Sequence, residues 1–178
     1  MDVPGHKDPL IITDAAANIA PNLADKVDIV QNAIDLGHAL GFQEVRVAIM
    51  SAMETVNPAV LSTIEAAALC KMAERGQITG GLLDGPLAFD NAISKQAAET
   101  KGIHSEVAGD PDILLAPDLE AANILAKLLS FLANADSAGL VLGARVPIIL
   151  TSRADSVRSR IASCAVAMLA AHARRKKL

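Results

Sequence analysis

Short apolar runs alternate along this sequence with longer segments whose apolar residues recur every three or four positions. The short runs predict strands at residues 10–13, 45–50, 78–83, 113–115, 139–142 and 146–150. The longer segments predict helices at residues 22–40, 58–75, 88–101, 119–134 and 155–174. Because strands alternate with helices, we expect an α/β protein with helices packed on both faces of a sheet.

Local signals mark several helix ends. Asn57 before Pro58 is typical of an N-cap followed by a first helical turn. Gly41, Gly76 and Gly102 stand where a helix end needs a residue in the left-handed region. With 3 Phe and no Trp or Tyr, the core must consist of Ala, Leu, Ile and Val. The many alanines allow helices to approach the sheet closely.

Composition and charge exclude several classes of protein. Charged residues make up 20% beside 52% hydrophobic residues, which argues against a disordered chain. No stretch of about 20 nearly uncharged residues predicts a membrane span, and the first residues show no secretory signal. A net charge of -4 offers no general attraction to nucleic acid. The basic residues 174–177 are expected to complement a helix end.

The two cysteines indicate the compartment. Cys70 and Cys164 lie within apolar helical patterns, without a neighbouring Cys or His at metal-ligand spacing. Both are therefore expected to be buried thiols in a reducing compartment. Together with the missing membrane and secretion signals, this predicts a soluble cytoplasmic protein.

Polar segments follow four of the predicted strands, and open α/β sheets bind ligands at the carboxyl ends of their strands. These segments are residues 13–18, 51–55, 83–90 and 150–156. In the last, Thr151, Ser152 and Arg153 directly precede a helix N-terminus, which suits a phosphate or a developing oxyanion. Asp155 or Ser156 can equally be an ordinary N-cap beside merely polar loop residues.

Other motifs give weaker signals. Asp84 and Asp90 flank Gly85-Pro86 after an apolar strand, so a carboxylate can meet a ligand there. The residues alone favour a structural interpretation, in which Gly-Pro fixes a turn and Asp90 caps the next helix. No Gly-rich phosphate loop with a following Lys is present, and residues 139–143 lack the spacing of a dinucleotide fingerprint. A nucleotide cofactor has little local support.

Taken together, four segments resemble the phosphate acetyl/butyryl-transferase family. They read ITDAAANIAP at 12–21, GGLLDGPLAFD at 80–90, APDLEAANILAK at 116–127 and TSRADS at 151–156, in the order of the family. The sequences of these segments are most similar to the butyryl-type branch and to the acyltransferase half of bifunctional bacterial proteins with an upstream enoyl-CoA hydratase domain. The resemblance implies acyl transfer between acyl-CoA and inorganic phosphate as substrates, without a metal or cofactor.

The resemblance also implies an architecture. Family members have a three-layer α/β sandwich of the isocitrate and isopropylmalate dehydrogenase type and are usually homodimers. They carry an N-terminal portion that closes one wall of the active-site cleft and supplies further arginines. Residues 1–178 are therefore expected to be the C-terminal portion of such an enzyme, with the N-terminal portion absent.

Individual roles follow from the last family motif. By resemblance, Arg153 holds phosphate or the acyl phosphate, and Ser152 donates a hydrogen bond to the reacting carbonyl or the thiol. Thr151, Ser156 and Asp84 are expected to take part in binding the substrates.

The general base is an open point. By resemblance to acetyl-type members, an aspartate base is expected one helical turn further on. This chain has Ser159 at that position. Asp155 is the nearest substitute.

Two further functions stay open. A catalytically silent folding and dimerisation fragment is suggested by the absent portion and by an alanine-rich, interface-like surface on the helix at 155–174. A dehydrogenase is suggested only by the shared fold, because no cofactor fingerprint is present. The acyl chain is not fixed, since one or two methylenes change binding by only about 1 to 3 kcal/mol.

Overall fold

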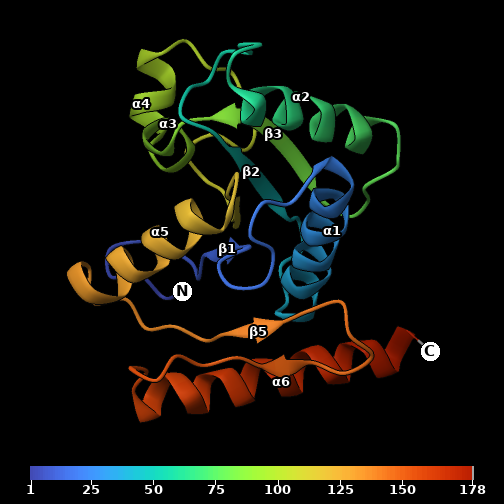
Figure 1. Cartoon of the computed structure of the whole chain (residues 1–178), viewed down its shortest axis with the longest axis vertical. Helices are drawn as coiled ribbons and strands as arrows, with labels where there is room; N and C mark the ends of the chain where they lie inside the picture. Colours follow the sequence, from blue (N-terminus) through green and yellow to red (C-terminus); the bar gives the residue numbers. More distant parts are fainter. Residues whose placement is uncertain (178) are drawn as a thin grey trace.

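The computed structural model describes residues 1–177, without the side chains of residues 176 and 177. Four strands form one parallel sheet in the order β1-β4-β2-β3 (Figure 1). Their bounds are β1 Ile11–Thr13, β2 Arg46–Met50, β3 Leu82–Leu87 and β4 Ile113–Leu115. The predicted α/β class is therefore confirmed, with the carboxyl ends of these strands at one edge of the sheet.

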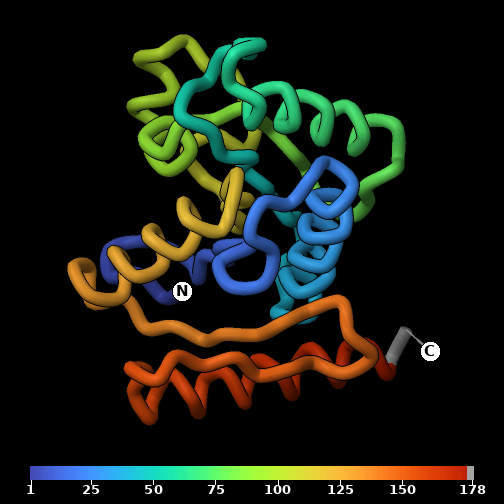
Figure 2. The backbone as a smooth tube through the Cα atoms, in the orientation of Figure 1, coloured from blue at the N-terminus to red at the C-terminus, as the bar shows by residue number. Residues whose placement is uncertain are grey.

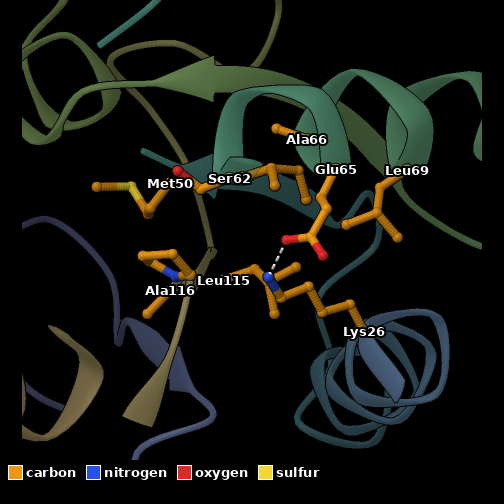
Figure 3. A pocket seen from close by; sticks show the side chains of 10 residues that line it. Lys26, Met50, Ser62, Glu65, Ala66, Leu69, Leu115 and Ala116 are labelled. Atoms are coloured by element: carbon orange, nitrogen blue, oxygen red, sulfur yellow. Dashed lines mark hydrogen bonds and ion pairs between the residues drawn. The ribbon is translucent and has the colours of Figure 1, made fainter. Parts of the chain in front are cut away.

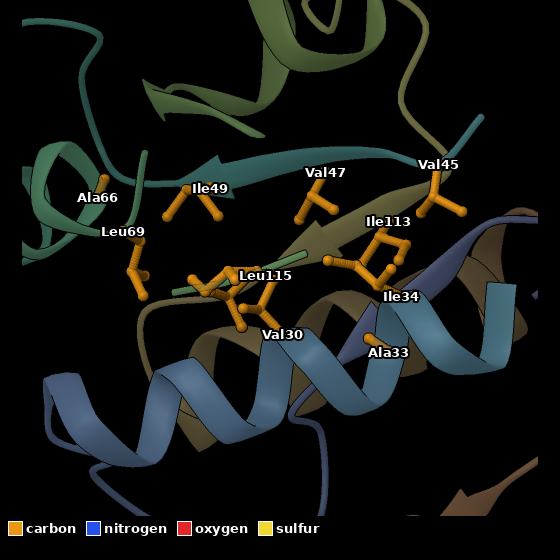
Figure 4. Close-up of a cluster of buried hydrophobic side chains, with 11 residues drawn as sticks. Val30, Ala33, Ile34, Val45, Val47, Ile49, Ala66, Leu69, Ile113 and Leu115 are labelled. Atoms are coloured by element: carbon orange, nitrogen blue, oxygen red, sulfur yellow. The ribbon is translucent and has the colours of Figure 1, made fainter. Parts of the chain in front are cut away.

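Helices cover both faces of this sheet. Val47 and Ile49 of β2 pack with Val30 on one face, in a cluster built with α1 (Leu23–Ala39) and α2 (Leu61–Glu74), as Figure 4 shows. Ala48 and Met50 point to the other face, into a cluster with α3 (Phe89–Ile93) and α4 (Lys95–Thr100). The partly buried Leu125 of α5 (Leu119–Leu132) packs against the second cluster. This alternation is the expected consequence of the two-residue period of a strand.

The predicted helix stops at glycine are confirmed. Gly41, Gly76 and Gly102 follow α1, α2 and α4, with φ of 99°, 73° and 70°. The predicted start of α2 is wrong, because the helix begins only at Leu61. The Asn57 side chain instead accepts from the N–H of Ala59 at 2.9 Å, which closes a separate turn before the helix.

The predicted third strand is shifted along the chain. Residues 78–83 were expected, but β3 runs from Leu82 to Leu87. Gly85 and Pro86, expected to form a turn, lie inside β3 where its register against β2 shifts. A Cβ on Gly85 would lie 2.7 Å from Ile49, so glycine permits the close approach of the two strands there.

The predicted helix at 88–101 is divided in two. Ser94 is extended between α3 and α4, and its hydroxyl accepts from the N–H of Ala97 at 3.2 Å as the N-cap of α4. The predicted capping role of Asp90 is wrong, because Ala88 is the N-cap of α3 and Asp90 lies in its first turn.

The last two strands are separate from the main sheet. β5 (Leu140–Val141) and β6 (Ile148–Ile149) pair antiparallel with each other, beside α6 (Val157–Lys177), at the end of the molecule that holds the C-terminus (Figures 1 and 2). The buried Ser163 hydroxyl accepts from the N–H of Gly139 at 3.0 Å and so ties α6 to β5. Helix α6 also contacts α1.

The basic residues at the end of the chain are described in part. Arg174 donates a hydrogen bond to the carbonyl of Ala144, in the loop between β5 and β6. The side chains of residues 176 and 177, for which an interaction with the helix end was predicted, lie outside the described residues.

The two cysteines differ in environment. Burial, followed by the nearby carboxylates of Asp84 and Glu74, raises the pKa of the Cys70 thiol to about 12. Cys164 is exposed on α6, so its predicted burial is wrong. The helical pattern around Cys164 is apolar, but α6 is covered on one side only. No helix among residues 1–177 is long and apolar enough to cross a membrane.

Candidate active site

The loop at 151–156 connects β6 to α6 and is folded on itself. The Asp155 carboxylate accepts from the backbone N–H of Ser152 at 2.6 Å, while the Asp155 N–H donates to the Ser152 carbonyl at 3.1 Å. Ser156 is the residue before α6, and its hydroxyl accepts from the N–H of Ser159 at 3.1 Å. Ser156 therefore fills the N-cap position that the sequence left open between it and Asp155.

Arg153 is exposed at the tip of this loop. Among the described residues its guanidinium has no hydrogen-bond or ion-pair partner, and the neighbouring Ser152 side chain is exposed as well. Thr151 is half-buried, two residues after the end of β6. An unpaired guanidinium beside a hydroxyl and the start of a 21-residue helix is a favourable place for an anion.

Ser159 occupies the position for which an aspartate base was considered. Its side chain is buried, and its hydroxyl lies 3.1 Å from that of Ser156. A hydroxyl without a basic partner is a poor general base at neutral pH. The only described carboxylate bonded into the loop is therefore that of Asp155, which must exchange its bond to Ser152 before it can take a proton.

Asp84 lies elsewhere. It belongs to β3, and its carboxylate accepts from the N–H of Gly85 at 2.8 Å. Figure 1 shows β3 beneath α2, whereas β5, β6 and α6 lie at the opposite end of the molecule. Within the described residues, no hydrogen bond or ion pair connects Asp84 with residues 151–156. The structure thus brings the five predicted loop residues together and does not add Asp84 to them.

A second polar loop follows β1. The Asp14 carboxylate accepts from the N–H groups of Ala16, Ala17 and Asn18 at 2.8–2.9 Å and from the Asn18 side chain at 2.7 Å. Burial by itself raises the pKa of Asp14, but these four hydrogen bonds together hold it below its usual value. Asp14 therefore shapes the loop at 13–18 and keeps its charge at neutral pH.

Sequence reasoning missed a network at the ends of β2 and β3. Lys101 pairs with Glu54 at 3.2 Å and with Asp90 at 3.0 Å, and the Asn91 amide donates to Glu54 at 3.2 Å. Hydrogen bonding to Asp90 raises the pKa of Lys101, and the same bond lowers that of Asp90. These contacts join the segment after β2 to α3 and α4, over separations that no local pattern reveals.

A buried ion pair was also missed. Lys26 of α1 and Glu65 of α2 meet at 2.5 Å, with 5% and 13% of their side chains exposed (Figure 3). They line a cavity of about 10 Å³ with Met50, Ser62 and Leu115, at the carboxyl ends of β2 and β4. This is room for about one water molecule and for no substrate.

The described residues form no obvious metal-binding site. Nowhere in residues 1–177 do three or more His, Cys, Asp or Glu side chains gather where they could hold a metal ion. That the reaction needs no metal or cofactor stays a prediction.

A parallel sheet with polar loops at its strand ends and a Ser-Arg loop before a long helix defines an α/β protein suited to an anionic ligand. The sequence model for "Phosphate acetyl/butaryl transferase" matches residues 1–168, and the chain belongs to this family. The resemblance identified from the four sequence segments is therefore confirmed.

The similar proteins carry names of the same kind. The chain is 71% identical over 175 residues to a phosphate acetyltransferase of Rhizobium meliloti, covering 98% of the chain and 55% of that protein. It is 48% identical over 169 residues to a probable phosphate butyryltransferase of Bacillus subtilis strain 168, covering 95% and 56%. The chain thus spans about half the length of the curated relatives it matches.

The fold matches a solved structure as well. The crystal structure of a branched-chain phosphotransacylase from Enterococcus faecalis V583 aligns with a TM-score of 0.87 at 34% identity. The alignment covers 96% of this chain and 61% of that one.

Proposed function

We propose that this chain takes part in acyl transfer between acyl-CoA and inorganic phosphate, as a phosphate acetyltransferase or phosphate butyryltransferase. Family membership and the names of the relatives support the reaction class. The single observation that carries the site is the exposed Arg153, which has no partner among the described residues, beside Ser152 before the start of α6.

The chemistry needs three events. A phosphate oxygen forms a bond to the thioester carbonyl carbon, the carbon–sulfur bond breaks, and CoA leaves as a thiolate that takes up a proton. Negative charge develops on the carbonyl oxygen in the transition state, so hydrogen-bond donors placed there lower the barrier.

The loop residues have distinct proposed roles. Arg153 binds the phosphate through charge-assisted hydrogen bonds, and the Ser152 hydroxyl donates to the carbonyl oxygen or the sulfur. Thr151 and Ser156 contribute hydroxyls beside the anion. Asp155 serves as the general base that takes up a proton during the transfer. Asp84 would contact a substrate only from β3, which is separate from the loop at 151–156. Its proposed role therefore depends on a substrate that reaches both β3 and this loop.

Architecture and partners complete the proposal. The fold is proposed to be part of a three-layer sandwich of the isocitrate and isopropylmalate dehydrogenase type, acting as a cytoplasmic homodimer. Free cysteines are consistent with a reducing compartment. Acyl-CoA, CoA and phosphate are the proposed partners, and neither nucleic acid nor a membrane is included.

A chimera tests the reaction and the site together. The 175 residues of this chain that align with the Rhizobium meliloti phosphate acetyltransferase would replace the matching part of that protein. Phosphate-dependent release of CoA from acetyl-CoA and butyryl-CoA would then be measured. We expect an active chimera, in which Arg153→Ala raises KM for phosphate or lowers kcat by about 10- to 150-fold, as for a lost charge-assisted bond. A folded but inactive chimera would refute the function, and an unchanged Arg153→Ala variant would remove Arg153 from the site.

A second candidate is a catalytically silent folding and dimerisation fragment. It is favoured by the coverage of only 55% of the Rhizobium meliloti relative and by the solvent-exposed loop around Arg153. Holding the reactants in position can lower the activation free energy by about 7 to 11 kcal/mol. A loop that is open to solvent does not supply this positioning. We therefore expect the isolated chain to have little activity, and turnover within about tenfold of the chimera would exclude this candidate.

A further inference from the structure

A cavity lies between α1 and the C-terminal part of α6, on the side of the molecule where the chain ends (Figures 1 and 2). Its volume is about 140 Å³. One water molecule needs about 10 to 15 Å³ of such space, so the cavity is large enough for a small organic molecule. Apolar walls come from Leu36 of α1, Leu142 directly after β5, and Ala170 and Ala173 of α6. Arg174 of α6 adds a charged side chain to this lining.

The guanidinium of Arg174 is half-buried and only partly paired. Its Nη1 donates to the carbonyl of Ala144, in the loop between β5 and β6. Among the residues whose side chains the structure describes, no carboxylate pairs with it and no second hydrogen-bond acceptor contacts it. A guanidinium carries five N–H donors. Arg174 can therefore bind an anion in the cavity through charge-assisted hydrogen bonds.

His38 and Asp35, which also line the cavity, restrict the charge of the ligand. His38 offers no free ring nitrogen, because Nδ1 lies 3.1 Å from the carbonyl of Phe42 and Nε2 lies 2.7 Å from that of Gly80. The Asp35 carboxylate repels negative charge, so a monoanion fits this lining better than a dianion. Both side chains are exposed, and the cavity therefore opens to solvent beside them.

We propose that this cavity binds a small organic monocarboxylate with a short aliphatic chain. The carboxylate pairs with Arg174, and the chain lies against Leu36, Leu142 and the two alanines of α6. The site is separate from the loop at 151–156, because the distance from Val157 at the start of α6 to Arg174 is about 25 Å along the helix axis. This inference does not rest on the proposed acyl transfer.

A ligand in this cavity contacts two parts of the fold at once. Helix α1 packs on the four-stranded sheet, whereas α6 packs on β5 and β6. Through Arg174 the carboxylate also acts on the loop between β5 and β6. Because a ligand stabilises the arrangement that binds it, occupancy strengthens the contact between α1 and α6.

NMR spectra of the 178-residue chain with ¹³C in its alanine methyl groups test the site directly. Ala39, Ala170 and Ala173 line the cavity, so we expect titration with butanoate to shift their signals in a saturable way. Butan-1-ol and butylamine carry the same chain without the negative charge. Each should bind at least about tenfold more weakly, as for a lost charge-assisted hydrogen bond. Inorganic phosphate, which is partly dianionic at neutral pH, should also bind more weakly than butanoate.

Variants of the lining separate charge from space. Arg174→Met keeps the aliphatic part of the side chain and removes the charge, so Kd for butanoate should rise at least about tenfold. Arg175→Met is the matched control, because it makes the same change at an exposed neighbour outside the lining, and it should leave Kd unchanged. Ala173→Leu fills the cavity while retaining Arg174, and it should abolish the saturable shifts of Ala39 and Ala170. Circular dichroism checks that each variant is folded.

Saturable shifts at the three alanines that weaken in Arg174→Met and persist in Arg175→Met support the site. The absence of any saturable shift with butanoate overturns the proposal, as does a Kd for butanoate that Arg174→Met leaves unchanged. Butan-1-ol or inorganic phosphate bound as tightly as butanoate overturns the choice of a monocarboxylate. If Arg174→Met does not fold, Ala173→Leu decides, because butanoate bound as tightly by it as by the unaltered chain places the ligand outside the cavity. None of these readings depends on the activity of the chimera.

Discussion

The Lys26–Glu65 ion pair gives the sharpest test of how the two helices on one face of the sheet are held. Lys26 is only 4% exposed as a residue, and the Glu65 side chain is 13% exposed. Replacing Lys26 with Met keeps the apolar stem but leaves the Glu65 carboxylate buried without its cation. Removing one partner of a buried pair commonly costs about 3 to 5 kcal/mol, and the partial exposure of Glu65 places our expectation near 3 kcal/mol.

The double variant shows whether the lost stability comes from leaving one buried charge unpaired or from losing the ion pair itself. Lys26→Met with Glu65→Leu removes both charges and fills the space with apolar side chains of similar volume. Such replacements of a whole buried pair are often neutral or stabilising. We therefore expect the double variant to be more stable than either Lys26→Met or Glu65→Leu alone.

An exposed pair in the same region serves as the control. Lys71 and Glu74 form an ion pair on α2 with 60% and 62% of their side chains exposed. Exposed pairs contribute about 0 to 1 kcal/mol, so Lys71→Met should change the stability little. The chain has no Trp and no Tyr, so unfolding in urea is followed by far-ultraviolet circular dichroism rather than fluorescence. Equal losses for Lys26→Met and Lys71→Met, or a double variant as unstable as the sum of its singles, would refute the reasoning.

Three further predictions concern other parts of the molecule. A thiol reagent at pH 8 should label the exposed Cys164 rapidly and Cys70, whose pKa is raised to about 12, only slowly; equal rates would contradict the difference in environment. Asp14→Asn should lower the free energy of unfolding at pH 7, because the lowered pKa of Asp14 means that its charged form stabilises the fold. This contribution is present above the usual value of 3.8 and is lost as the pH falls through the folded pKa, so the two proteins should converge in acid. Gly85→Ala should destabilise by about 1 to 3 kcal/mol in urea unfolding, since its Cβ would lie 2.7 Å from Ile49; an unchanged midpoint would show that the strands can separate without cost.

Much of the fold could be predicted because it depends on short-range patterns. The period of the apolar residues located α1 and α5 closely, and it placed β2 and β4 within one residue. Glycines that need a positive φ marked three helix ends correctly. Four motifs in order were enough to identify the family, which the match over residues 1–168 confirms.

Errors arose where local signals had two solutions. Gly85 and Pro86 are typical of a turn, yet contact with Ile49 of β2 draws them into a strand. Ser94 lies within one apolar helical period, which predicted a continuous helix, but serine favours an N-cap over a helix interior and caps α4 in the structure. Strand periodicity at 139–142 and 146–150 was recognised, but periodicity does not specify the pairing partner, and these strands pair only with each other.

The candidate site divides in the same way. By itself the sequence determined that Thr151, Ser152, Arg153, Asp155 and Ser156 share one loop at a helix start, because neighbours in the chain are neighbours in space. Only the tertiary structure decided that Ser156 caps α6, that Asp155 holds the Ser152 N–H, and that Asp84 lies apart on β3.

The remaining contacts join residues that are distant in sequence. Lys26 and Glu65 are 39 positions apart, and Lys101 and Glu54 are 47 apart. Neither pair has a period or spacing to reveal it, because a charge on a helix looks the same in sequence whether it faces water or another helix. Burial and partnership are properties of the packed chain, so the sequence determined the elements and their chemistry, and the tertiary structure decided which side chains meet.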